Sequence, residues 1–201
     1  MTPSAITRLF LIRHGPTHAK TMVGWSDLPA DLSDTAALAR LDAYLPSDAI
    51  VVSSDLSRAR DTATAIMGQR RRLAHDPDLR EIHFGAWELR SWAEIDAESP
   101  EHIRAYWETP GDVAPPGGES WNTVCARVDG AINRLIEQHR GQTLVVVGHF
   151  GQILTQIQRA EQLTAEEAFS HRIDNLSVTE LSHQGERWDR GWSSGKINHI
   201  P

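Results

Sequence analysis

The chain has 201 residues, which is enough for one domain with a substantial buried core. Its 40% hydrophobic and 23% charged residues are typical of a globular protein, and its net charge of -7 excludes the broad basic face that nucleic-acid binders need. No apolar run is long enough to span a membrane, and the N-terminal residues lack the layout of a secretory signal. The single cysteine excludes an intramolecular disulfide. We therefore expect a cytoplasmic protein that binds neither nucleic acid nor membrane.

Short apolar runs alternate with amphipathic helical patterns along the chain. In chain order, we predict a strand at Leu9–Ile12, a helix over 35–45, a strand at Ile50–Val52, helices over 56–67 and 121–136, a strand at Leu144–Val147, a helix after Gly151, and strands at Leu176–Leu181 and Glu186–Trp192. Continuous apolar strands interleaved with such helices are typical of a mostly parallel sheet covered on both faces. We expect an α/β fold, a three-layer α/β/α sandwich, in a single domain over residues 1–201.

Residues 91–118 depart from this alternation. They hold short helical patterns, then Thr109-Pro110-Gly111 and Pro115-Pro116-Gly117-Gly118. We predict a small excursion over one end of the sheet and over the active site, since loops commonly carry substrate specificity.

Cationic or chargeable side chains follow three of the predicted strands. Arg13 and His14 follow the first strand, Arg58 lies in the first turn of the helix after the second, and His149 follows the third. The carboxyl ends of parallel strands meet at one edge of a sheet, where open α/β folds bind ligands. Arginine forks and helix N-termini both favour phosphate there. The sequence therefore predicts a basic phosphate pocket within an acidic protein.

Four motifs in a fixed order carry a family resemblance. They are Arg13-His14-Gly15-Pro16-Thr17, the stretch Ser53–Ala63, the stretch Leu79–Glu88, and Val147-Gly148-His149-Phe150-Gly151. From about residue 8 to 155 they resemble the histidine phosphatase, or phosphoglycerate mutase-like, superfamily. The resemblance implies a phosphoglycerate mutase-like fold and a metal-independent phosphoric monoester hydrolase that uses no cofactor and acts on a small phosphorylated metabolite.

The resemblance also implies catalytic roles for five residues. His14 would attack phosphorus and become phosphohistidine, which requires an unprotonated ring nitrogen. Arg13, Arg58 and His149 would hold the non-bridging oxygens. Glu81 would protonate the leaving oxygen and then accept a proton from water.

The identity of the general acid stays open at this point. Protonated Glu81 at neutral pH requires a raised pKa, which burial or a second carboxylate must supply against the nearby arginines. Glu88 and Glu119 are alternative acids in the same part of the sequence.

Several residues near the motifs are predicted to contact substrate. Thr17 either donates to phosphate or caps the next turn, and Trp25 lies near the expected pocket rim. Lys20, Leu89, Phe150 and Pro16 depart from the family pattern, and Leu89 stands where glycine is frequent. No clustered Cys/His pattern indicates a metal site. The predicted substrate-binding set is Arg13, Gly15, Thr17, Lys20, Trp25, Arg58, His149 and Phe150.

A phosphatase of small phosphorylated metabolites is the leading functional hypothesis. Phosphoglycerate mutases carry a longer basic insertion, whereas residues 91–118 hold one arginine, Arg104, no lysine and six Asp or Glu. Residues 115–120 resemble the α-ribazole phosphatase branch, which makes a nucleotide-loop precursor one candidate substrate. The alternatives are mutase-type phosphoryl transfer and a non-catalytic pseudophosphatase that binds phosphoryl groups.

Overall fold

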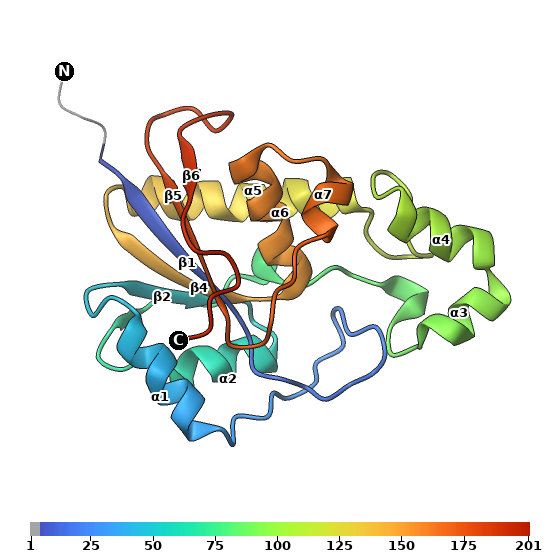
Figure 1. The fold of residues 1–201 in the computed structure, drawn as a ribbon, viewed down its shortest axis with the longest axis horizontal. Coiled ribbons are helices and arrows are strands. Elements are labelled where there is room, and N and C mark those ends of the chain that lie inside the picture. Colours follow the sequence, from blue (N-terminus) through green and yellow to red (C-terminus); the bar gives the residue numbers. More distant parts are fainter. Residues whose placement is uncertain (1–4) are drawn as a thin grey trace.

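A mixed sheet forms the centre of the computed structural model, which describes residues 5–201 (Figure 1). Within these residues six strands form one sheet in the order β3-β2-β4-β1-β5-β6. The strands β1 to β4 run parallel to one another, and β5 and β6 add an antiparallel edge. Their bounds are β1 Thr7–Arg13, β2 Ile50–Ser53, β3 Arg71–Arg72, β4 Thr143–Gly148, β5 Val178–His183 and β6 Trp192–Ser194.

Helices cover both faces of this sheet, as the sequence predicts (Figure 1). Leu38 and Leu41 of α1 and Ala59 and Ala63 of α2 pack on one face with Val145 and Val147. The other face is covered by α5 and α6, whose apolar stripes pack on the alternate residues of β1 and β4. The predicted α/β sandwich is confirmed. The helices are α1 Thr35–Tyr44, α2 Ser57–Ala65, α3 Trp92–Glu98, α4 Pro100–Glu108, α5 Trp121–Gln138, α6 Phe150–Glu161 and α7 Ala165–Phe169.

Register brings the carboxyl ends of the central strands together. Arg13 pairs with Gly148, and Ser53 pairs with Val147. The residues that follow β1, β2 and β4 therefore leave the sheet side by side, and the first turns of α2 and α6 begin at this edge.

Local capping explains where the helices begin. The Asp34 side chain accepts from Ala37 N at the start of α1, and the Ser120 side chain accepts from Thr123 N at the start of α5. In α5 the predicted apolar stripe is buried, and Cys125 lies partly buried at its margin. Burial raises the pKa of the Cys125 thiol to about 12, so this thiol stays protonated.

The C-terminal prediction is wrong in part. β5 begins at Val178 rather than Leu176, and β6 covers Trp192–Ser194, so the strand predicted over Glu186–Trp192 is absent except at its last residue. Residues 186–191 turn instead, with the Trp188 ring stacked on His183 at 5.0 Å between centroids. Trp188 and Trp192 both pack on His183, so their spacing reflects a turn and not a strand. The prediction also omitted β3 and α7, which are too short to produce a periodic pattern.

The segment 91–118 contains α3 and α4, which stand apart from the helices that cover the sheet (Figure 1). Ser91 and Glu94 form a capping box at the start of α3. Tyr106 of α4 packs edge-on against Trp87, with 5.4 Å between ring centroids, and Trp107 packs edge-on against Phe169, with 5.6 Å between ring centroids. Along residues 5–201, no helix combines the length and apolarity needed to cross a membrane.

Candidate active site

The His14 imidazole lies directly after β1 and is 6% exposed. Its Nδ1 is 2.6 Å from the Gly15 carbonyl oxygen, an acceptor that requires a proton on Nδ1. Its Nε2 accepts from Arg58 Nε at 3.2 Å and therefore carries the lone pair. Burial, and after it the charge of Arg58, lowers the pKa of His14 to about 3. At neutral pH the site thus holds a neutral imidazole whose Nε2 is available as a nucleophile.

The Arg58 guanidinium is held by two backbone carbonyls of the loop 24–26. It lies in the first turn of α2 and is 1% exposed. Nη1 donates to Ser26 O at 3.0 Å and Nη2 donates to Gly24 O at 2.6 Å. Because a guanidinium has further N–H donors, Arg58 can hold phosphate oxygens while these bonds persist.

Arg13 supplies a second cation, which is partly buried. Its Nη1 donates to Ile173 O at 2.6 Å, and its guanidinium carbon lies 5.5 Å from the centre of the Phe150 ring. Its Nε is buried and has no hydrogen-bond partner among the described residues. A buried donor without a partner is costly, and binding an anion would satisfy it.

His149 shows the same feature more strongly. It is fully buried as the N-cap of α6, and its ring packs against that of His14 with 5.1 Å between centroids. Within the described residues, neither of its ring nitrogens has a hydrogen-bond partner. Burial and the nearby cations, Arg58 first, lower the pKa of His149 well below its usual value. A neutral ring that has no partner among residues 5–201 and lies beside His14 is suited to donate to a bound phosphoryl oxygen.

Glu81 lies against the start of α6. Its carboxylate accepts from Gly151 N at 2.9 Å and from Ile82 N at 3.0 Å. Burial raises its pKa, although these bonds and the charges of Arg58 and Arg13 act in the opposite direction. Burial rather than a second carboxylate is therefore the cause. A Cβ at Gly151 would lie 2.6 Å from Glu81 Oε1, so glycine permits this approach.

The two alternative acids have other partners. Burial would raise the pKa of Glu88, but hydrogen bonds from the Ser26 hydroxyl and from backbone N–H groups lower it overall. Glu119 forms an ion pair with Arg127 at 2.7 Å and accepts from His83 N. A carboxylate whose pKa is lowered by several donors, as that of Glu88 is, is a poor proton donor. The Glu119 carboxylate is already engaged by Arg127 and His83 N, so the contacts favour Glu81 as the acid.

The other residues predicted to contact substrate differ in how free their polar groups are. Gly15 N donates to Thr62 Oγ1 at 2.9 Å, so this N–H already has a partner. Thr17 Oγ1 accepts from Ala19 N at 3.4 Å, a weak turn cap that leaves its hydroxyl proton available. Lys20 is exposed, and Phe150 lies beneath Arg13.

Trp25 is packed between other side chains rather than projecting freely. Its Nε1 donates to Glu81 O at 2.9 Å. The Arg80 guanidinium carbon lies 4.7 Å from the centre of its ring, and the His83 ring lies 4.5 Å away between centroids. These contacts make Trp25 a support for the Glu81 backbone.

Some supporting residues escape prediction from the sequence. Asn175 donates to His14 O at 2.7 Å from a loop that carries no pattern. Arg127 donates to Arg80 O and Glu81 O, at 3.0 and 3.1 Å. A usable signal exists only for Arg127, because it is a charged residue spaced like the buried stripe of α5.

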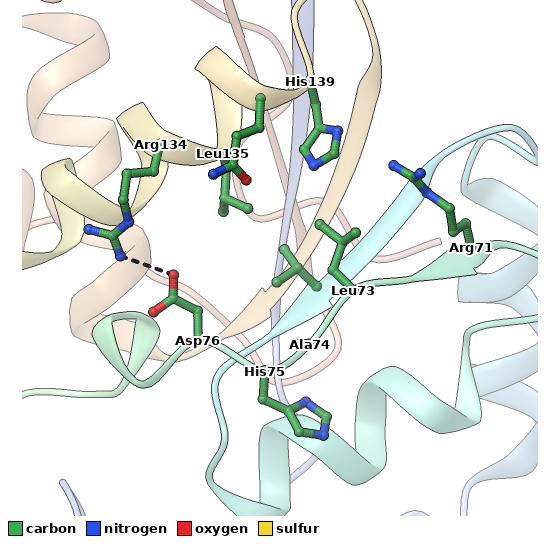
Figure 2. Close-up of a pocket in the computed structure, with 10 residues that line it drawn as sticks. Arg71, Leu73, Ala74, His75, Asp76, Arg134, Leu135 and His139 are labelled. Carbon is green, nitrogen blue, oxygen red and sulfur yellow. Dashed lines mark hydrogen bonds and ion pairs between the residues drawn. The ribbon is translucent and has the colours of Figure 1, made fainter.

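A pocket of about 460 Å³ lies elsewhere, between the end of α5 and the segment after β3 (Figure 2). Figure 2 shows Arg134 paired with Asp76 at its margin, where the ion-pair distance is 3.1 Å. None of His14, Arg58, Glu81 and His149 lines this pocket, so it is separate from the candidate active site. Along residues 5–201, no three His, Cys, Asp or Glu side chains are grouped in a way that suits a metal ion.

A family model described as the histidine phosphatase superfamily, branch 1, matches residues 9–192. The chain is 33% identical over 195 residues to a bifunctional protein of Mycobacterium tuberculosis, covering 89% of this chain and 51% of that protein. It thus spans about half the length of the first curated relatives it matches.

Two further relatives match over most of their own length. A metal-independent phosphoserine phosphatase of Arabidopsis thaliana is 31% identical, with 98% of this chain and 84% of that protein covered. An adenosylcobalamin/alpha-ribazole phosphatase of Escherichia coli is 31% identical, with 83% and 85% covered. Among solved structures, a mycobacterial glucosyl-3-phosphoglycerate phosphatase superposes with a TM-score of 0.83 at 27% identity, covering 96% of this chain and 99% of that one.

Proposed function

Since this chain belongs to the histidine phosphatase superfamily, we propose that it hydrolyses small phosphate monoesters through a phosphohistidine on His14. Relatives that carry phosphatase names support hydrolysis. One observation carries the proposal: His14 has its Nδ1 proton directed at Gly15 O and its Nε2 beside Arg58, and its ring packs against the His149 ring, which has no hydrogen-bond partner along residues 5–201. This arrangement suits attack by nitrogen on a phosphorus atom held by cations.

In the first step, His14 Nε2 forms a bond to phosphorus while the bond to the leaving oxygen breaks. Glu81 enters this step protonated and transfers its proton to that oxygen, so the alcohol departs neutral. Arg13, Arg58 and His149 hold the non-bridging oxygens. Burial of these groups strengthens each of these interactions.

In the second step, water replaces the alcohol. Glu81, now ionised, accepts a proton from that water as its oxygen bonds to phosphorus. The Nε2–phosphorus bond breaks, inorganic phosphate forms, and His14 returns to its neutral state. Glu81 ends protonated, so the cycle closes without a metal ion or an external base.

The wider setting follows from composition and placement. We propose a cytoplasmic protein whose partner is a small phosphorylated metabolite rather than nucleic acid. Its net charge of -7 supports the choice of partner, and its single cysteine, which cannot form an intramolecular disulfide, supports the compartment. We also propose one domain over residues 1–201, with the segment 91–118 extending over the active site. The phosphatase reaction does not depend on these two points.

Trapping the covalent intermediate tests the proposal. Acid-labile, base-stable phosphate should appear on His14 when turnover of an aryl phosphate is quenched. His14→Ala should abolish both the adduct and turnover, and circular dichroism should show that the variant is folded. A folded His14→Ala protein with substantial phosphatase activity would overturn the mechanism.

A further inference from the structure

Glu88 holds the loop of residues 24–26 through an unusual number of hydrogen bonds. Its Oε1 accepts from Trp25 N at 2.7 Å, and its Oε2 accepts from Gly24 N at 3.1 Å and Ser26 N at 3.2 Å. The Ser26 hydroxyl also donates to Oε2 at 2.7 Å, and Phe84 N donates to Oε1 at 3.1 Å. One half-buried carboxylate thus orients three consecutive backbone N–H groups of this loop.

That loop in turn orients Arg58. When its N–H groups face Glu88, the carbonyls of Gly24 and Ser26 are left to accept from Arg58 Nη2 and Nη1. With both terminal nitrogens held, the remaining Nε is directed at His14 Nε2. A chain of contacts therefore runs from Glu88 through the loop to Arg58 and ends at the nucleophile.

The loop has little freedom to adopt another path. A Cβ on Gly24 would lie 2.1 Å from Ile82 O and 2.4 Å from Glu88 Oε1, so the backbone approaches both closely. Met22 and the residues after Glu88 also exchange two backbone hydrogen bonds, Met22 N to Arg90 O and Leu89 N to Met22 O. The position of Glu88 requires a group that only accepts hydrogen bonds, because its partners are four backbone N–H groups and one hydroxyl, all acting as donors.

We propose that Glu88 is a positioning residue for phosphoryl transfer, whose carboxylate aims Arg58 at the transferring phosphoryl group by holding the loop 24–26. This inference rests on the proposed phosphohistidine chemistry. It assigns Glu88 no proton transfer and no contact with substrate. Its effect on the reaction passes through Arg58.

The test is a double-mutant cycle on the rate of phosphoenzyme formation with an aryl phosphate. Glu88→Gln places an amide N–H₂ where an acceptor is needed, and we expect a rate loss of about 10–100-fold from misplaced Arg58. In the Arg58→Ala background the same substitution should change the rate by less than about twofold. Glu167→Gln is the matched control, because Glu167 accepts from Thr164 N and Oγ1 at the start of α7. This control should keep the wild-type rate.

A second readout separates positioning from a general loss of structure. Burial is the largest cause of the lowered pKa of His14, and the charge of Arg58 lowers it further. If Glu88→Gln releases Arg58, the His14 pKa should rise, so the acid limb of the phosphorylation rate should move to higher pH. A purely structural defect would reduce the fraction of active enzyme and leave the position of this limb unchanged.

The outcomes distinguish this proposal from the proposed function. Equal losses from Glu88→Gln with and without Arg58, or no loss at all, would overturn the positioning role while His14 phosphorylation stands. An active His14→Ala variant would overturn both. If Glu88→Gln does not fold, Ser26→Ala removes only the hydroxyl donor to Glu88. It should then give a smaller rate loss that is again absent in the Arg58→Ala background.

Discussion

At the scale of single residues, burial sets the protonation states that the proposed chemistry needs. Removing a group from water disfavours its charged form, so the same burial lowers the pKa of His14 and raises the pKa of Glu81. The site therefore combines an unprotonated imidazole with a carboxyl group whose pKa is raised. Glu88 is also partly buried, yet the five hydrogen bonds that its carboxylate accepts keep its pKa low.

Glu81→Gln tests the acid at this scale. An alkoxide leaves poorly without a proton, whereas p-nitrophenolate leaves readily, so the substitution should slow phosphoenzyme formation sharply only with an alkyl phosphate. The loss should approach the roughly 10²–10⁴-fold that general acids contribute. With p-nitrophenyl phosphate, rapid-quench measurements should show a burst of nitrophenol followed by slow turnover. Phosphohistidine accumulates because the variant has no carboxylate at position 81 to activate water.

The comparison requires pre-steady-state rates, because the slow second step would mask the first in steady state. Equal slowing of both substrates without a burst would mean that Glu81 positions other groups. Glu119→Gln then becomes the next variant to examine, since Glu119 lies beside the same backbone through His83 N.

At the scale of elements, strand ends and turns carry the site. The loop from η2, Gly85–Trp87, into α3 includes Leu89, whose φ of +60° is unfavourable for a residue with a Cβ. Leu89 stands where the family pattern often has glycine, and 49% of its surface is exposed. At the sheet edge, β3 is only two residues long and carries two arginines, a composition that discourages pairing with another sheet.

Leu89→Gly should stabilise the protein. The left-handed conformation costs a non-glycine residue about 1–2 kcal/mol. Glycine loses roughly 0.5–1 kcal/mol more chain entropy on folding, so we expect a net gain in the free energy of unfolding of up to about 1.5 kcal/mol. Urea denaturation of the wild type and the variant measures it. Leu89→Ala is the control, because it shortens the same exposed side chain but keeps the strain. A glycine variant no more stable than the alanine variant would contradict this explanation.

At the scale of the whole molecule, an acidic protein concentrates cations in one place. The net charge is -7, while the buried Arg58 and the partly buried Arg13 lie beside His14. The segment 91–118, with α3 and α4, is acidic and holds Arg104 as its only arginine. Arg104 pairs with Asp96 within that segment at 3.2 Å, so the segment itself offers little free positive charge.

Product analysis tests this consequence. A mutase must retain the phosphorylated intermediate while it reorients, and the acidic segment 91–118 is poorly suited to do so. We expect release of phosphate to water and negligible interconversion of 2- and 3-phosphoglycerate, even with bisphosphoglycerate present. Phosphate release and isomer ratio, measured in one reaction by ³¹P NMR, decide the point. Interconversion faster than phosphate release would reverse the preference for a phosphatase.

The sequence by itself determined the features whose cause is local. Continuous apolar runs located β1, β2 and β4, because strands buried on both faces need no polar alternation. The parallel order of these strands follows from the helices between them, which places Arg13, His14, Arg58 and His149 at one edge. The sequence pattern did not locate β3, because two residues are too few to show a periodic pattern. It misplaced β6, because Trp188 packs on His183 from a turn and not from a strand.

Only the tertiary structure decided how the candidate site works. The His14 tautomer depends on the direction of the Gly15 carbonyl, and the raised pKa of Glu81 depends on how deeply the start of α6 buries it. The partners of Glu88 on the 24–26 loop lie 64, 63 and 62 positions away in the chain. Desolvation and hydrogen bonding act through space, so residues that are distant in sequence control them, and the folded chain alone brings those residues together.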